Sequence, residues 1–123
     1  MEFRTVCIAA LALTCPTIVF AAEVSSILPV KTGSYAPAKA GCETAMASFI
    51  YVEANGLGAN KTTGKVRKVS RDGKAYVLDV LWVEAGSTDA DGDRDTVRIE
   101  VKDDHTFFFS NTTSDKTLMR WCN

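Results

Sequence analysis

The stretch KAYVLDVLWVE, residues Lys74 to Glu84, decides the fold of this 123-residue chain. Apolar side chains occupy both of its alternating faces: Tyr76, Leu78, Val80 and Trp82 on one, and Val77, Leu81 and Val83 on the other. Because successive side chains of a β-strand point to opposite faces, this pattern predicts a strand in the centre of a sheet. Asp79 interrupts the pattern, and we interpret it as a solvent-facing position or a satisfied hydrogen-bond partner.

The segment TVRIEVK, residues 96–102, shows the other strand pattern, in which apolar and polar residues alternate. This alternation is typical of an antiparallel strand with one buried face. We expect Val97, Ile99 and Val101 to be buried, and Arg98, Glu100 and Lys102 to be exposed.

Shorter strand-like segments lie on both sides of these two, and turn residues separate them. They cover residues 47–53, 65–70, 106–110 and 117–122, and the Pro- and Gly-containing stretch 23–41 has room for one short strand. No long segment has the 3.6-residue period of a helix. The sequence therefore predicts an all-β fold, a small antiparallel meander that forms either a barrel or a sandwich.

In a meander, successive connections lie at alternate ends of the sheet. The loops 54–63, 85–95 and 111–115 should therefore share one end, and the tight turns at 71–73 and 103–104 the other. Binding residues often lie on long loops that a rigid scaffold holds in place. We therefore expect the functional surface at the end with the long loops.

The first residues, MEFRTVCIAALALTCPTIVFAAEV, have the features of a secretory signal peptide. Arg4 precedes an apolar run, and Val19-Phe20-Ala21 resembles the A-x-A pattern that precedes a signal-peptidase cleavage site. We therefore predict cleavage after residue 21 and one domain over residues 22–123. The run is shorter than the roughly 20 residues of a membrane span. Pro16 disfavours lipidation at Cys15. We expect a periplasmic or secreted protein without a membrane span.

Two cysteines remain after the signal peptide, Cys42 and Cys122. In an exported chain, a pair of cysteines predicts a disulfide. This bond would join the start of the domain to its last residues.

Charge and residue content argue against several classes of function. The net charge of −1 gives no support for nucleic-acid binding, and we interpret the basic segment 61–74 as a solvated face. The one histidine, His105, lies in a predicted turn, and the carboxylates cluster in a loop rather than across a cleft. We therefore predict a non-enzymatic protein without a cofactor.

The acidic stretch GSTDADGDRD, residues 86–95, allows two interpretations. It carries aspartates at alternate positions: Asp89, Asp91, Asp93 and Asp95. It is not an EF-hand loop, because Arg94 stands where that loop needs glycine. The four carboxylates could still form a looser calcium site, as an alternative to a surface that attracts a positively charged partner.

The layout of the chain resembles that of the small periplasmic inhibitors of c-type lysozyme from Gram-negative bacteria. The shared features are the exported β domain, the segment LPVKTGSY that precedes Cys42, last strands that are rich in aromatic residues, and Trp121-Cys122 near the end of the chain. Known members carry an SGxxY motif and a second motif that ends in TKG. The nearest pieces here are residues 32–35, TGSY, and residues 62–65, TTGK. The first is closer to the SGxY motif of related inhibitors of other lysozyme types, with Thr in place of the first Ser.

This resemblance implies an inhibitor that occludes the active-site cleft of c-type lysozyme with its long-loop end. The four aspartates would supply charge complementarity to a basic enzyme. The cleft contacts would be Ser34, Tyr35, Thr63 and Lys65. The alternative is a calcium-binding or structural envelope protein that uses the same aspartates.

Overall fold

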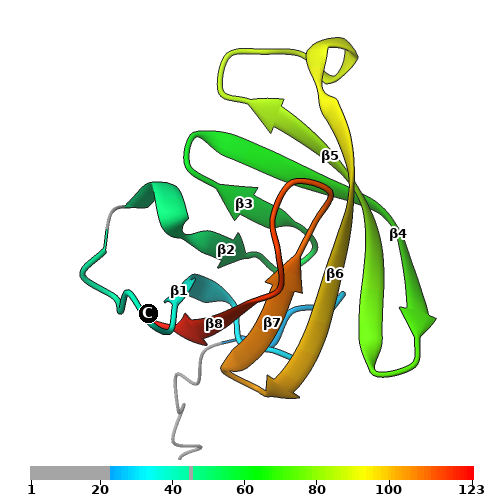
Figure 1. Cartoon of the computed structure of the whole chain (residues 1–123). Helices are drawn as coiled ribbons and strands as arrows, with labels where there is room; N and C mark the ends of the chain where they lie inside the picture. Colours follow the sequence, from blue (N-terminus) through cyan, green and yellow to red (C-terminus); the bar gives the residue numbers. More distant parts are fainter. Residues whose placement is uncertain (1–22, 45) are drawn as a thin grey trace, which may run out of the picture.

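The computed structural model describes residues 23–44 and 46–123, so the predicted signal peptide lies outside the described residues. Eight antiparallel strands follow one another in chain order, and β8 pairs with β1 to close a barrel (Figure 1). The elements are β1 (Gly33–Pro37), η1 (Met46–Ser48), β2 (Ile50–Val52), β3 (Leu57–Ala59), β4 (Thr62–Asp72), β5 (Ala75–Glu84), η2 (Asp89–Asp91), β6 (Asp93–Asp103), β7 (Thr106–Ser110) and β8 (Thr117–Trp121). The all-β meander is confirmed, and the barrel replaces the sandwich as its form.

Strand β5 is central, as its two apolar faces predict, and it pairs with β4 and β6 along most of its length. Its inward face puts Leu78 and Val80 into the fully buried core. Its outward face is covered as well, so Leu81 and Val83 are also buried. Asp79 is half-buried on that outward face, between Lys68 and Thr96 of the neighbouring strands.

The predicted register of β6 is confirmed. Val97 and Ile99 are 0% exposed, whereas Arg98 and Lys102 are exposed and Glu100 is half-buried. Val101 is half-buried and packs against the core from one side.

The prediction of one loop over residues 54–63 is wrong, because this stretch contains β3 and the first residues of β4. Leu57 is fully buried, and Gly58 lies close against Tyr51 of β2. The strand predicted over 65–70 extends over the whole of β4, and the one predicted over 47–53 shrinks to β2, after the turn η1. A three-residue strand that contains glycine lacks the β-branched side chains by which strands are recognised.

The two ends of the barrel differ. At one end the segment 23–32 folds across the opening and buries Leu28 and Val30 in the core; we call this the plugged end. Backbone bonds fix it there, from Ser26 N to Ala54 O and from Lys31 N to Asp104 O, both at 2.7 Å. The other end, which we call the loop end, carries the connections 38–49, 60–61, 85–92 and 111–116.

The predicted disulfide is confirmed. Cys42 and Cys122 are bonded with an S–S distance of 2.03 Å across a sequence separation of 80 residues. The bond ties the β1–β2 connection to the segment that follows β8, next to the seam where those terminal strands pair. Across residues 23–44 and 46–123, none of the helices combines the length and the apolar character that a membrane crossing requires.

Candidate functional site

The acidic connection between β5 and β6, residues 85–92, projects beyond the other connections of the loop end and is uppermost in Figure 1. It includes the turn η2 and folds back over the outward face of β5. A methyl group on Gly92 would stand 2.8 Å from Leu81 Cδ1, so the backbone lies directly on this side chain. The acidic connection is therefore packed against the barrel rather than loosely solvated.

Asp89 is neutralised by basic residues of β4. Its carboxylate lies 2.5 Å from Lys65 Nζ and 3.9 Å from an Arg67 guanidinium nitrogen. The hydrogen bond from Lys65 lowers the pKa of Asp89 below its ordinary value, and the charges of Lys65 and Arg67 add to this effect. Two residues predicted for separate roles, Asp89 and Lys65, thus meet and hold the acidic connection in place.

Besides Asp89, three other carboxylates of this region are exposed: Glu84, Asp91 and Asp93. Among the residues that the structure describes, none of the three has a Lys, Arg or His nitrogen within 4.0 Å. Asp91 accepts one hydrogen bond, from the Thr88 hydroxyl at 3.3 Å. Their charge is therefore available to a partner.

Asp95 does not belong to this exposed group. It is half-buried at the rim of the barrel and accepts hydrogen bonds from Trp82 Nε1 at 3.0 Å, Asn111 Nδ2 at 3.0 Å and Thr112 Oγ1 at 2.9 Å. The backbone N–H of Thr112 donates a further bond, at 3.3 Å. Partial burial raises the pKa of Asp95, but the bonds from Trp82, Thr112 and Asn111 outweigh it, and the net pKa lies below the ordinary value. Asp95 therefore fastens the β7–β8 connection to β5 and β6.

Not all of the remaining predicted cleft contacts lie on one surface with the acidic connection. Tyr35 is 0% exposed; its hydroxyl donates to Lys31 O at 2.6 Å, and its ring lies 4.6 Å from that of Phe107. Burial raises its pKa, and the charges of Asp104 and Asp103 act in the same direction. Tyr35, predicted as a partner contact, is therefore part of the core in this structure.

Ser34 and Thr63 lie on strands rather than on loops. Ser34 is half-buried on β1, and its backbone N–H and C=O bond Asn123 O and Cys122 N. Thr63 is exposed on the outward face of β4, which it shares with Lys65. Of the predicted contacts, Thr63 and Lys65 therefore lie near the acidic connection, and Ser34 lies on a different side of the barrel.

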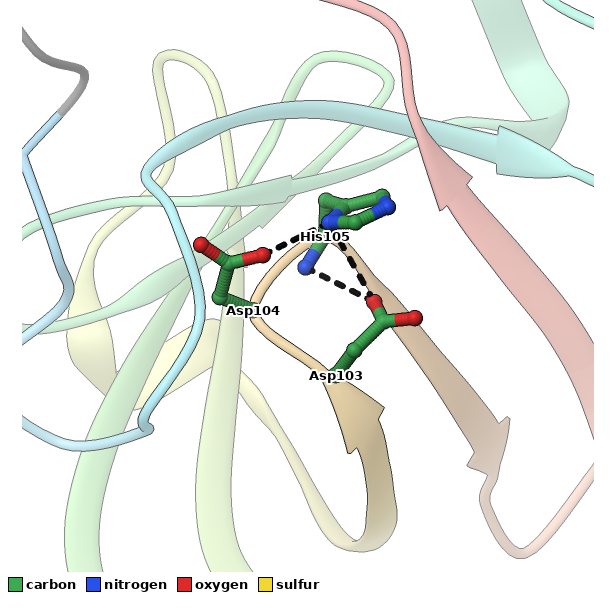
Figure 2. Close-up of side chains that lie close together, drawn as sticks. All are labelled: Asp103, Asp104 and His105. Carbon is green, nitrogen blue, oxygen red and sulfur yellow. Dashed lines mark hydrogen bonds and ion pairs between the residues drawn. The ribbon is translucent and has the colours of Figure 1, made fainter.

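The four aspartates do not converge as a calcium site needs, since Asp89 faces Lys65 and Asp95 faces Trp82. Within the described ranges, the group of potential metal ligands lies at the plugged end, in the β6–β7 turn: Asp103, Asp104 and His105, whose ligand atoms lie within 4.8 Å of one another (Figure 2). His105 N donates to Asp103 Oδ1 at 3.1 Å, and His105 Nδ1 lies 2.6 Å from Asp104 Oδ1. All three residues are exposed, and these contacts stabilise the turn itself.

Two hollows lie side by side at the loop end, with Trp82 and Asn111 in the lining of both. The first has a volume of about 310 Å³ and an apolar lining that includes Ile50, Ala59 and Phe109. The second has a volume of about 380 Å³ and a polar lining that includes Glu84, Asp93, Arg94 and Thr112. Trp82 and Asn111 do not belong to the site predicted from the sequence, although the alternation of β5 places Trp82 on the same face as Leu78 and Val80.

No protein-family model matches the sequence, and comparisons with curated proteins and with solved structures gave no match.

Proposed function

We propose that the chain is an exported inhibitor of c-type lysozyme that binds the enzyme with its loop end. One observation supports this proposal above the others: Glu84, Asp91 and Asp93 are exposed and have no basic partner among the described residues. Asp91 lies on the acidic connection that projects from the barrel, and Glu84 and Asp93 flank it at the ends of β5 and β6. A surface of this kind suits a strongly basic protein, because complementary charge speeds encounter and fixes orientation.

The packing of the acidic connection supports the same function. Gly92 lies on Leu81, and Lys65 holds Asp89, so the carboxylates keep their places before a partner arrives. A loop that is already ordered loses less conformational freedom on binding, and more of the interaction energy is left for affinity.

Carboxylates are unsuited to the catalytic cleft itself, which in lysozyme holds two carboxyl groups of its own. Hydrogen-bond donors beside the acidic connection suit it better. The β3–β4 turn is joined to that connection by a bond from Ala85 N to Lys61 O at 2.8 Å, and Lys61 is exposed. We propose that the acidic residues contact lysozyme at the rim of the interface, and that the hydrogen-bond donors of Lys61 and Thr63 enter its catalytic cleft.

The direct test is gel filtration of residues 22–123 with c-type lysozyme at physiological salt, followed by an assay of cell-wall lysis. A one-to-one complex in which lysis is blocked is the expected result. Separate elution with undiminished lysis, at low as well as physiological salt, would contradict the proposal.

A further inference from the structure

The barrel is closed at one end and hollowed at the other. Leu28 and Val30 of the N-terminal segment fill the plugged end. At the loop end, the strands present apolar side chains around the hollow of about 310 Å³, among them Pro37, Ile50, Ala59, Phe109 and Met119. Small eight-stranded barrels hold ligands in such mouths, and volumes above about 300 Å³ are large enough for small molecules.

The adjoining polar hollow gives this mouth a charged side. Three carboxylates line it, from Glu84, Asp93 and Asp95, against one guanidinium, from Arg94. Asp95 is engaged by its hydrogen bonds, whereas Glu84 and Asp93 are exposed. The net charge around the hollow is negative, and so favours a cation.

The wall between the hollows is preformed. The indole of Trp82 donates to Asp95, and it lies so close over Gly64 that an added methyl group would stand 2.8 Å from Trp82 Cζ3. An aromatic ring held next to carboxylates is a favourable environment for an organic cation, because the π face and the negative charges attract the same group.

We propose that the mouth of the barrel binds a small amphipathic organic cation, with its apolar body in the hollow beside Phe109 and Ile50 and its ammonium group between Trp82, Asp93 and Glu84. This inference does not depend on lysozyme binding, and its test contains no lysozyme. A failure of either proposal leaves the other open.

The test uses three probes with the same body and different charge: 3-phenylpropylamine, 3-phenylpropan-1-ol and 3-phenylpropanoate. The chain has two tryptophans, so its indole N–H resonances provide an internal control. Trp82 lines the mouth, whereas Trp121 donates to Thr32 O at 3.1 Å on the opposite side of the core. We expect the amine to shift the Trp82 signal in a saturable way, with the Trp121 signal unmoved and with weaker binding of the alcohol and the carboxylate.

Two aspartates of the acidic region supply a matched pair of variants. Asp93 lines the polar hollow and Asp91 does not, and both are exposed. Asp93→Asn should weaken amine binding about threefold to tenfold, as expected for the loss of one nearby charge partly screened by water. Asp91→Asn should leave it within about twofold, because its carboxylate lies outside the hollow.

A third variant tests the apolar hollow. Ala59→Phe should fill it and abolish the Trp82 shift by the amine; if this variant does not fold, the aspartate pair still decides the charged part. The proposal is overturned if the three probes bind alike, if the two tryptophan signals move together, or if Asp91→Asn weakens binding as much as Asp93→Asn.

Discussion

Asp95 shows how one residue can be misjudged from its neighbours in the sequence. It belongs to a run of alternating aspartates, yet it faces the mouth of the barrel and accepts bonds from Trp82, Asn111 and Thr112. It also lies in phase with Val97 and Ile99, the buried face of β6. Extending the period-2 pattern of that strand by one step would have placed it correctly, because alternate residues share a face.

Replacing Asp95 tests this structural role. Asp95→Asn keeps the size of the side chain but presents an amide N–H₂ to groups that are themselves donors. We expect a loss of about 1–3 kcal/mol in the free energy of unfolding at neutral pH, measured by urea denaturation. Asp79→Asn is the control, since Asp79 is half-buried without a side-chain hydrogen bond among the described residues; it should change stability by less than about 0.5 kcal/mol.

The effect of Asp95→Asn should depend on pH. The pKa of Asp95 is lowered in the folded protein, so its contribution is complete above the unfolded-state value of about 3.9. It is lost as pH falls through the lower folded-state value. Wild type and variant should therefore converge in stability in acid. A difference that stays constant from neutral pH down to about pH 2 would contradict the role of the ionised carboxylate.

At the scale of elements, the acidic connection matters most, because it is held by contacts that lie far apart in the sequence. Lys65 of β4 reaches Asp89 across 24 positions, and Gly92 rests on Leu81 of β5. Nothing in the local pattern of residues 86–95 predicts these contacts, since they arise from the pairing of β4 with β5.

The basic residues of β4 also have a second role. Because β3 pairs only with the first residues of β4, the rest of β4 has, among the described residues, a free strand edge on that side, and charged side chains at such an edge discourage aggregation.

Adding a methyl group to Gly92 should loosen the acidic connection. In Gly92→Ala, the new group would stand 2.8 Å from Leu81 Cδ1 and 3.1 Å from the backbone oxygen of Asp89, so the turn has to shift. We expect a loss of about 1 kcal/mol or more in unfolding free energy and faster amide exchange over residues 89–93.

Trimming Leu81 provides the control for this prediction. In the Gly92→Ala, Leu81→Ala double variant, the smaller side chain removes both the Cδ1 and the Cγ contact, so the two changes should cost less together than the sum of each alone. Strict additivity, or a Gly92→Ala variant with wild-type exchange, would show that the connection does not pack on β5 as described.

At the scale of the whole molecule, sequence patterns predicted the central strand, the register of β6 and the disulfide. They also placed the connections around 85–92 and 111–116 at one end, but the predicted loop 54–63 does not join them as a whole, because the turn before β3 lies at the plugged end. They did not distinguish a barrel from a sandwich, because closure depends on the pairing of β1 with β8, which lie at opposite ends of the chain. They also missed β3, where Leu57-Gly58-Ala59 has little strand character of its own. What local periodicity cannot predict is the set of contacts that closure brings about.

The disulfide should account for much of the stability of this closure. Its loop of 80 residues corresponds to about 4.5 kcal/mol in the chain-entropy model, a large share of the 5–15 kcal/mol typical of a domain. The Cys42→Ser, Cys122→Ser variant should unfold at a much lower urea concentration than wild type. Adding a reductant should lower the midpoint of the wild type and leave that of the variant unchanged. Equal midpoints for the oxidised wild type and the variant would contradict this account.

The central claim is that the acidic loop end attracts and binds a c-type lysozyme, and the association rate constant measured against salt concentration tests it most directly. We predict that Asp91→Asn, Asp93→Asn slows association several-fold at low salt, with a difference that shrinks as salt screens the charges and with little change in dissociation. The control, Glu23→Gln, Glu53→Gln, removes the same charge from exposed positions at the plugged end and should leave the rate near that of wild type. Equal slowing by both pairs, or no association with lysozyme at any salt concentration, would contradict the account.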